Sequence, residues 1–387
     1  MKAIFTGGGT GGHIFPIIAV ARELTNIYLQ KTQLASGNSK KENLELFYLG
    51  PKSEIGPEAE MLLKQEGIKI KYILAGKLRR YFGIEVVFQN IIDIFKTPIG
   101  ILQSFSFLFW KAPDLIFSKG GYGSFPVVFS GKLLGIPIFL HESDIEPGLA
   151  NKKIGKYASI IFISFPNTGF FPAKKMVLSG NPIRRELLEG SIDDAKKLFQ
   201  LTSSKPVILI IGGSQGAQKI NDLVLNILPK LLENFEIIHQ TGSKNFKEVE
   251  SGADVMINKD LKKYYHPFPF LEEKNLKHAL AVCDLIVSRA GSGSIFEIAA
   301  LEKPSILIPL SGSAQNHQIK NAYAYAENRA AIVMEEISLT PHFFLQTIKN
   351  ILENQKEMEN IKKAAKNFSK PDAAKKIANY IMDYLYQ

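Results

Sequence analysis

The sequence predicts an α/β protein with two doubly wound, Rossmann-like parallel sheets whose domains face a central cleft. Three observations support this fold class. The chain has 387 residues, which exceeds the length that a single hydrophobic core usually fills. Short apolar runs alternate with amphipathic segments, as expected for parallel strands covered by helices. Two of these runs, KAIFT and PVILII, each lead into a glycine-rich turn and a helical pattern, which indicates two similar halves.

The apolar runs predict two successive series of strands. The first series comprises Lys2–Thr6, Leu44–Leu49, Ile68–Ile73, Leu115–Ser118, Ile138–His141 and Ile160–Ile163. The second series comprises Val207–Ile211, Glu236–Gln240, Leu285–Ser288 and Ser305–Ile308. A Gly-Asn-Pro sequence within Ser179–Leu187 interrupts regular structure between the two series. We therefore expect one domain over residues 1–183 and a second domain from residue 184.

The composition indicates an ordinary globular protein with an anionic partner. The chain is 45% hydrophobic and 22% charged, and its net charge of +10 is concentrated in residues 1–183. A basic half favours a phosphorylated ligand, an anionic membrane or nucleic acid, although excess lysine also serves solubility alone. The single cysteine, Cys283, lies in an apolar run and favours a reducing compartment. We expect no secretory signal peptide at the N-terminus, because only a few apolar residues precede the first glycine turn and no small-residue cleavage site follows them.

Glycine-rich turns follow several predicted strands and favour phosphate binding. GGGTGGH spans residues 7–13, GGSQGAQ spans 212–218, and a third turn follows Ser288. Such a turn at the carboxyl end of a parallel strand lets backbone N–H groups approach a phosphate, and the next helix adds the positive end of its dipole. The first two turns lack both the dinucleotide-binding spacing and the P-loop lysine. Each of them alone is therefore equally compatible with a purely structural turn.

Polar residues after the third turn fit a nucleotide sugar. Glu297 lies one turn into the following helix, where a carboxylate can accept both hydroxyls of a ribose, unless it is only a solvated helix residue. The amides of Ser313–Ala322 suit sugar hydroxyls, unless they only begin a polar helix. The stretches Ser118–Pro126 and His141–Gly148 also follow strands. The loops after the first, fourth and fifth strands are therefore expected to converge on one edge of the first domain.

The segment Gly76–Lys111 is expected to contact a membrane surface. Apolar residues at helical spacing form one face of its first part, and the second apolar run, Ile99–Trp110, is too short to span a bilayer, which takes about 20 residues. Basic residues flank both runs. The residues that define this surface are Arg79, Arg80, Phe88, Phe95 and Trp110. Apolar surface with a basic rim is typical of a protein that lies on an anionic leaflet; the alternative is that both helices pack into the core.

Taken together, the motifs resemble those of the MurG family of UDP-N-acetylglucosamine:lipid I N-acetylglucosaminyltransferases, which act in peptidoglycan synthesis. The motifs that carry the resemblance are, in order, GGTGGH, GGYGSFP, HESD, GNPIRREL, GGSQGAQxxN, SRAGxxSIFEIAALEKPSILIP and QNHQxxNA. The resemblance implies a GT-B architecture in which residues 370–387 cross back to the first domain, so that the second domain covers 184–369.

The same resemblance implies the substrates and the location of the protein. It implies UDP-GlcNAc and undecaprenyl-linked lipid I as substrates, the anionic cytoplasmic leaflet of a bacterial membrane as a peripheral binding surface, and no nucleic-acid partner. No Asp-x-Asp sequence occurs in the chain, so we expect neither a cofactor nor a dedicated metal site.

The resemblance also implies a role for each matching residue. The donor-binding residues would be Thr10, Gly11, Gly12, Arg184, Ser214, Phe270, Leu271, Ser292, Gly293, Ser294, Glu297, Gln318 and Asn321. The acceptor-binding residues would be Gly8, Gly9, Gly121, Tyr122 and Asp144. Arg184 would face the donor diphosphate and Glu297 the ribose. His13 would be the base that deprotonates the attacking hydroxyl; the alternative is that it only caps the helix or packs at its start.

One position departs from the family pattern. The usual HEQN reads HESD, so Asp144 stands where the family has asparagine. An ionised carboxylate only accepts hydrogen bonds, whereas an amide also donates them. Asp144 is therefore expected to be a catalytic residue, as a second base or a group that orients His13, or else only to bind sugar. Other interpretations are another GT-B lipid glycosyltransferase, a UDP-GlcNAc 2-epimerase and a non-catalytic UDP-sugar-binding protein.

Overall fold

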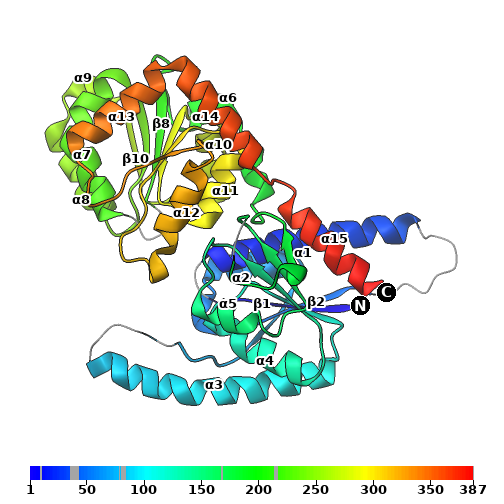
Figure 1. The fold of residues 1–387 in the computed structure, drawn as a ribbon. Helices are drawn as coiled ribbons and strands as arrows, with labels where there is room; N and C mark the ends of the chain where they lie inside the picture. The colour runs from blue at the N-terminus through cyan, green and yellow to red at the C-terminus, as the bar shows by residue number, and fades with distance from the viewer. Residues whose placement is uncertain are drawn as a thin grey trace. The chain divides into compact units, whose positions relative to one another are not determined.

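The computed structural model describes residues 1–8, 11–34, 43–77, 79, 84–166, 169–212 and 217–386. The chain forms two compact units (Figure 1). The first unit consists of Met1–Ile183 together with Lys370–Gln387, and the second consists of Arg184–Ser369. Each unit contains one parallel sheet covered by helices, which confirms the predicted fold class of two doubly wound sheets.

The sheet of the first unit has seven strands among the described residues, all parallel, in the order β3-β2-β1-β4-β5-β6-β7. These strands are β1 (Lys2–Thr6), β2 (Glu45–Gly50), β3 (Lys69–Tyr72), β4 (Leu115–Ser118), β5 (Ile138–Glu142), β6 (Ile160–Ile163) and β7 (Met176–Leu178). The direction of strand order reverses between β1 and β4. Ligands of open parallel sheets bind beyond the carboxyl ends of the strands at such a reversal.

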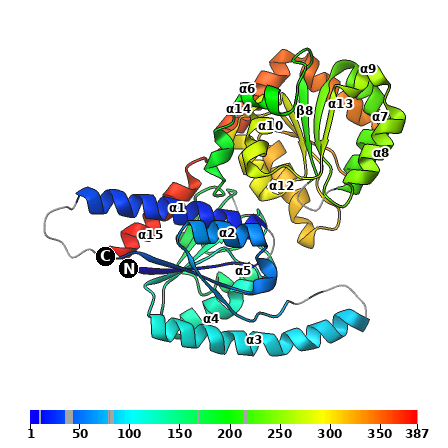
Figure 2. The same cartoon turned by 180° about the vertical axis from the view of Figure 1, so that it is seen from behind.

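Helices cover both faces of this sheet (Figure 2). One face carries α1 (Gly11–Leu34), α2 (Pro57–Gln65) and α15 (Ala373–Leu385), and the other carries α3 (Ile84–Lys111), α4 (Phe125–Leu133) and α5 (Leu149–Ile154). Side chains alternate across a strand, so Phe5 of β1 joins the core under α1 and α15 while Ile4 joins the opposite core. The C-terminal helix α15 thus shares a core with the first strand.

The sequence indicates two separate helices for the two apolar runs of the Gly76–Lys111 segment, and this expectation is wrong. They form the single helix α3, which continues through Pro98. A proline removes one backbone donor from a helix interior and usually kinks or ends the helix. Here the flanking turns stay helical, and Leu108 of α3 is fully buried in the core beneath the sheet.

The sheet of the second unit has six described strands, all parallel, in the order β10-β9-β8-β11-β12-β13. They are β8 (Val207–Ile211), β9 (Glu236–Gln240), β10 (Tyr265–Phe268), β11 (Leu285–Ser288), β12 (Ser305–Leu307) and β13 (Ile332–Val333). Its helices are α6 (Ile192–Leu198), α7 (Gln218–Asn234), α8 (Phe246–Met256), α9 (Lys259–Lys262), α10 (Glu273–Val282), α11 (Ser292–Ala300), α12 (His317–Ala326), α13 (Pro341–Glu353) and α14 (Gln355–Phe368). Its strand order reverses between β8 and β11, as in the first unit.

Candidate functional site

The glycine turns after β1 and β4 pack directly against each other. The Gly8 N–H donates to the Gly120 carbonyl at 3.1 Å. A Cβ atom on Gly8 would lie 2.7 Å from the Gly123 nitrogen, and one on Gly121 would lie 2.3 Å from the Gly8 oxygen. Gly121 also has a φ of +80°, which L side chains rarely adopt. The described glycines are therefore needed for this close backbone approach, whatever ligand the turns bind.

His13 lies in the first turn of α1, which begins at Gly11 at the carboxyl end of β1. Its Nδ1 atom is buried and has no hydrogen-bond partner among the described residues. Burial and the positive charge of Lys119 lower the pKa of His13 to about 4, against the opposing effect of Asp144. The imidazole is therefore neutral at pH 7 and can accept a proton. Gly12 follows Gly11 and is exposed.

The last residue of β5, Glu142, and the residues that follow it lie at the same edge of the sheet as His13. Asp144 is half-buried, and its backbone N–H donates to Glu142 Oε1 at 2.9 Å. Asn151 Nδ2 donates to Glu142 Oε2 at 2.7 Å. Burial, followed by the negative charge of Asp144, raises the pKa of Glu142. The structure thus brings His13 and Asp144 to one edge and adds Glu142 and Lys119, which the sequence analysis did not select.

Tyr122, a predicted acceptor residue, begins a short 3₁₀ turn after Gly121 and is half-buried. The Lys77 ammonium lies 5.5 Å from the centre of its ring, which is within the range of a cation–π contact. Four other predicted residues lie outside the described part of the chain: Gly9, Thr10, Arg80 and Ser214.

In the second unit, the turn after β11 leads into α11. Ser292, Gly293 and Ser294 form the first turn of this helix, and Gly291 before them provides no side-chain cap. The first N–H groups of a helix have no partner within the helix, so this end favours an anion. Glu297 follows one turn later on the same helix.

Two predicted donor-binding residues bind each other. Arg184 Nε donates to Glu297 Oε1 at 3.0 Å, and Arg184 Nη2 donates to Glu297 Oε2 at 3.2 Å. Arg184 Nη1 also lies 3.6 Å from Glu273 Oε2. Bidentate pairing of this kind fixes the plane of the carboxylate. Arg184, at the start of the second unit, and Glu297 of α11 therefore form one ion pair within that unit.

The remaining predicted donor residues differ in accessibility. Phe270 is exposed, whereas Leu271 is buried and its N–H donates to Gln240 Oε1 at 3.0 Å. Gln318 Oε1 accepts from the Leu310 N–H at 3.0 Å. Asn321 is fully buried. Of these side chains, Phe270 is the most accessible to a ligand.

The apolar face of α3 is exposed. Its members are Phe88, Ile91, Ile92, Ile94, Phe95, Ile99, Leu102, Phe105, Phe109 and Trp110. The exposed fractions of Phe88, Phe95 and Trp110 are 64%, 67% and 80%. This arrangement rules out the alternative that α3 only packs into the core. Among the described helices, one stretch, Phe88–Lys111, is long and apolar enough to cross a membrane, by length and composition alone. Within its apolar window of 18 residues, 22% is buried, and one such stretch is weak evidence by itself.

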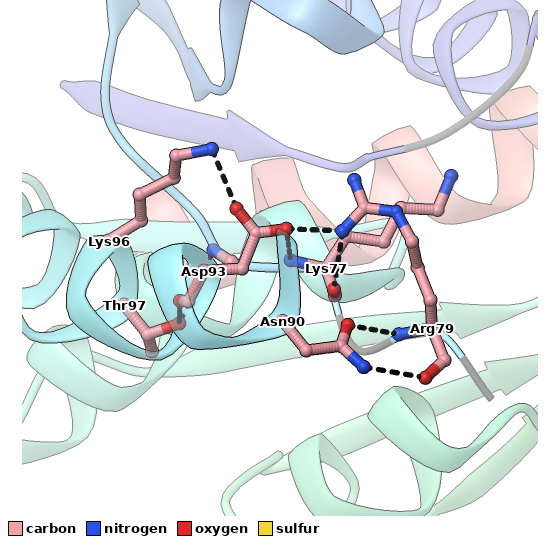
Figure 3. A network of polar contacts seen from close by, with 7 residues as sticks. Lys77, Arg79, Asn90, Asp93, Lys96 and Thr97 are labelled. Carbon is pink, nitrogen blue, oxygen red and sulfur yellow. Dashed lines mark hydrogen bonds and ion pairs between the residues drawn. The ribbon is translucent and has the colours of Figure 1, made fainter. Parts of the chain in front are cut away.

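Three polar residues of α3, Asn90, Asp93 and Thr97, bind the segment that precedes the helix. Figure 3 shows Asp93, which is 6% exposed, between Arg79 Nη1 and Lys96 Nζ, each 2.6 Å from a carboxylate oxygen. Asn90 exchanges two hydrogen bonds with the Arg79 backbone, at 3.0 and 2.9 Å. Gly76 also lies close to α3, because a Cβ atom there would be 1.9 Å from the Asp93 oxygen. The Arg79 guanidinium, expected as a free rim cation, is therefore bound within the protein.

Comparisons with known proteins agree with this arrangement. Residues 3–163 match the glycosyltransferase family 28 N-terminal domain, and residues 207–377 match the glycosyltransferase family 28 C-terminal domain. A Clostridium tetani protein named UDP-N-acetylglucosamine–N-acetylmuramyl-(pentapeptide) pyrophosphoryl-undecaprenol N-acetylglucosamine transferase is 36% identical over 94% of each chain.

Two solved structures show the same fold. MurG of Acinetobacter baumannii has a TM-score of 0.72 at 24% identity and covers 99% of each chain. The UDP-GlcNAc 2-epimerase of Neisseria meningitidis has a TM-score of 0.67 at 15% identity, covering 99% of this chain and 100% of its own. At these identities the structures support the architecture and do not distinguish a transferase from an epimerase.

Proposed function

Because the chain belongs to glycosyltransferase family 28 and to its MurG-type N-acetylglucosaminyltransferases, we propose that the first unit binds the lipid acceptor and the second binds the donor. The enzyme transfers N-acetylglucosamine from UDP-GlcNAc to lipid I, which is undecaprenyl-pyrophosphoryl-MurNAc-pentapeptide, and forms lipid II. The observation that carries this conclusion is the 36% identity, over 94% of each chain, to a protein named for that activity.

In the proposed reaction, the 4-hydroxyl of MurNAc attacks the anomeric carbon of GlcNAc with inversion, and UDP leaves. His13 accepts the hydroxyl proton. Its position at the carboxyl end of β1 and its neutral state at pH 7 support this role. A general base of this kind contributes a rate factor of roughly 10² to 10⁴. Asp144 would stabilise the imidazolium that forms, because its charge raises the pKa of His13.

The second unit would stabilise the leaving diphosphate and hold the ribose. The N-terminal turn of α11 offers backbone N–H groups and the positive end of a helix dipole. Arg184, whose guanidinium Glu297 holds in place, would provide a fixed positive charge that faces the donor diphosphate. Glu297 retains lone pairs for ribose hydroxyls, because a carboxylate has about four acceptor positions.

We further propose that the apolar face of α3 lies on the anionic cytoplasmic leaflet, where lipid I is embedded. An exposed apolar helix face with polar residues directed into the protein supports this binding mode. Two exposed lysines, Lys77 and Lys111, lie just before α3 and at its last residue, and the half-buried Lys96 lies on the helix itself. Their positive charge favours a surface of anionic phospholipid.

One assay tests the activity against its alternatives. The full-length protein is incubated with radiolabelled UDP-GlcNAc and a lipid I analogue that has a shortened polyprenyl chain. We expect labelled disaccharide lipid and an equal amount of UDP, and we expect His13→Ala to reduce the rate. Labelled ManNAc without labelled lipid would identify an epimerase instead. UDP-GlcNAc binding without turnover would identify a binding protein.

A further inference from the structure

A buried lysine stands at the edge of the first sheet, where His13 lies. Lys119 directly follows β4, is 2% exposed, and its backbone N–H donates to the Thr6 carbonyl at 2.8 Å. Its ammonium donates a short hydrogen bond to the Ser143 hydroxyl. Ser143 in turn donates to Asn181 Oδ1 at 3.2 Å. A buried ammonium is costly unless charges or hydrogen bonds compensate it, so this position requires an explanation.

Two carboxylates balance the charge of Lys119. Burial lowers the pKa of Lys119, while the charges of Glu142 and Asp144 oppose that shift. Glu142 is itself 3% exposed and is held by Asn151 and by the Asp144 backbone. The ends of β4 and β5 therefore bring one lysine and two acidic residues together, of which Lys119 and Glu142 are buried and Asp144 is half-buried. Such clusters are more common at functional sites than elsewhere in proteins.

His13 adjoins this cluster across Gly7. A Cβ atom on Gly7 would lie 3.3 Å from the Lys119 Cβ and 3.6 Å from the His13 Cβ, so these two side chains flank the same glycine. The charged groups that act on the imidazole are Lys119 after β4 and Asp144 after β5, and His141 of β5 also interacts with it. Burial lowers the pKa of His141 well below its usual value, so His141 adds no positive charge at neutral pH.

We propose that Lys119 is a positioning residue for His13: its buried ammonium, bound to Ser143 and grouped with Glu142 and Asp144 beside the imidazole, adds to the effect of burial and disfavours the protonated form of His13. Lys119 and Asp144 act on His13 with opposite sign. The cation disfavours the imidazolium in the free enzyme. The anion stabilises it when a proton arrives from the acceptor. The catalytic meaning of this pair rests on the proposed function, in which His13 is the base.

A purely structural lysine predicts a different outcome. If Lys119 only fills space and ties Ser143 in place, its replacement lowers stability and leaves the titration of His13 where it was. If our proposal holds, Lys119→Met raises the pKa of His13 and Asp144→Asn lowers it, each by about one pH unit. The double variant, which lacks both charges, should lie between the two.

The titration is measured directly on the full chain, labelled with ¹³C at the Cε1 of histidine. The chain has 7 histidines, and the signal of His13 is assigned by its loss in His13→Gln. Lys119→Arg, which keeps the charge, and Lys132→Met, which removes an exposed lysine of α4, are the controls and should leave the titration unchanged. If Lys119→Met does not fold, Lys119→Gln, which keeps a polar group for the Ser143 hydroxyl, measures the same effect. An unchanged pKa of His13 on loss of Lys119 overturns the inference.

The pH dependence of kcat/KM, measured on the same variants, separates this inference from the proposed function. The acidic limb should move to higher pH in Lys119→Met and to lower pH in Asp144→Asn, because kcat/KM reports groups of the free enzyme. A shifted titration with an unmoved acidic limb upholds the effect of Lys119 on His13. The same result would overturn the assignment of His13 as the base, which belongs to the proposed function.

Discussion

The Arg184 guanidinium and the Glu297 carboxylate form a two-point ion pair, with N–O distances of 3.0 and 3.2 Å. Arg184 begins the second unit, whereas Glu297 lies 113 positions later on α11. Both were expected to bind the donor independently, one at the diphosphate and one at the ribose. The pairing means that each side chain orients the other, so their contributions to donor binding should depend on each other.

Replacing Glu297 should therefore weaken UDP binding by two routes. Glu297→Ala removes the acceptor for the ribose hydroxyls and also frees Arg184. Loss of a charge-assisted hydrogen bond costs about 1.5–3 kcal/mol, which corresponds to a 10- to 150-fold weaker Kd in calorimetry with UDP. Glu359→Ala, which breaks an exposed pair with Lys362 on α14, is the matched control and should leave the affinity unchanged.

The double variant Arg184→Ala/Glu297→Ala tests the dependence itself. Residues that act as a pair give a double-variant loss smaller than the sum of the single losses. We expect a deviation from additivity of about 1 kcal/mol or more in the free energy of UDP binding. Strict additivity would mean that the two side chains contact the donor separately, as the sequence alone suggested.

Most of both sheets could be predicted from the sequence, and the strands that were missed share a physical property. Every predicted strand was found, with its bounds shifted by at most one residue at either end. The missed strands are β7, β10 and β13, and each lies at the edge of its sheet. Central strands of a parallel sheet are buried on both faces and give apolar runs, whereas an edge strand needs none. β10 even contains Pro267, which only an edge strand tolerates easily.

The candidate site could be located from the sequence, but its contacts could not. Motifs after strands mark the edge where His13 and Asp144 meet, because the carboxyl ends of parallel strands share one edge. The role of Lys119 depends on burial, and a lysine before two glycines gives no sign of burial in the sequence. Likewise, Arg79 and Asp93 are 14 positions apart, and nothing in the sequence indicates that they pair. Only the folded path of the chain brings them together.

The acidic limb of kcat/KM should lie well below the usual range of histidine. His13 must be unprotonated to act as a base, so activity is kept above its pKa and lost as the pH falls through it. Burial and Lys119 lower this pKa to about 4, compared with about 6.5 for an exposed histidine. We expect no loss of kcat/KM at pH 6.5 that is attributable to His13. Steady-state rates between pH 5 and 8, with folding checked by circular dichroism, should therefore show no loss that depends on His13.

A group other than His13 can titrate within this range, and a variant identifies it. Burial raises the pKa of Glu142, which lies in the same cluster. A limb near neutral pH that disappears in Glu142→Gln belongs to that carboxyl group. A limb near 6.5 that persists in Glu142→Gln would contradict the low pKa of His13.

Polar substitutions on the apolar face of α3 should weaken membrane binding without unfolding the protein. Phe88 and Phe95 are more than half exposed, so Phe88→Gln/Phe95→Gln should change the free energy of unfolding by less than about 1 kcal/mol. Burial of one phenylalanine in lipid contributes about 1.5–3 kcal/mol. Cosedimentation with vesicles of anionic phosphatidylglycerol should therefore fall by tenfold or more.

Two controls restrict the interpretation of this result. Phe343→Gln replaces an exposed phenylalanine of α13 in the second unit and should leave vesicle binding unchanged. Lys77→Glu/Lys111→Glu should weaken binding most at low salt, because exposed charges are screened over about 10 Å at 0.1 M. If the wild-type protein does not sediment with vesicles but forms a dimer that Phe88→Gln/Phe95→Gln dissociates, the face binds a second copy of the chain and the membrane proposal is wrong.

Asp93 should hold the segment before α3 in place, and its loss should release that segment. Burial disfavours the charge of Asp93, but hydrogen bonds from Lys96, Arg79 and the Lys77 backbone outweigh it and hold its pKa below the usual value. Its contribution to stability is therefore present above the unfolded-state pKa of about 3.9 and is lost as the pH falls through the lower folded-state pKa. Asp93→Asn removes the charge and keeps the shape, and should destabilise the protein by about 1–3 kcal/mol at pH 7.

Hydrogen exchange shows whether the loss of stability in Asp93→Asn is confined to the segment before α3. Hydrogen exchange should accelerate at the amides of residues 74–77 in Asp93→Asn, because the Lys77 N–H donates to Asp93 and the Gly76 N–H to Thr97 in the next turn. Asp383→Asn, which weakens an exposed pair with Lys31 at 3.5 Å, is the control and should not change that exchange. Arg79→Glu should resemble Asp93→Asn or exceed it, since it places a second carboxylate beside Asp93. A change in vesicle binding by Arg79→Glu would therefore reflect this structural loss as well as any lost attraction to lipid. Hydrogen exchange tests the structural part alone: equal exchange rates in Arg79→Glu and wild type would show that the ion pair does not hold the segment.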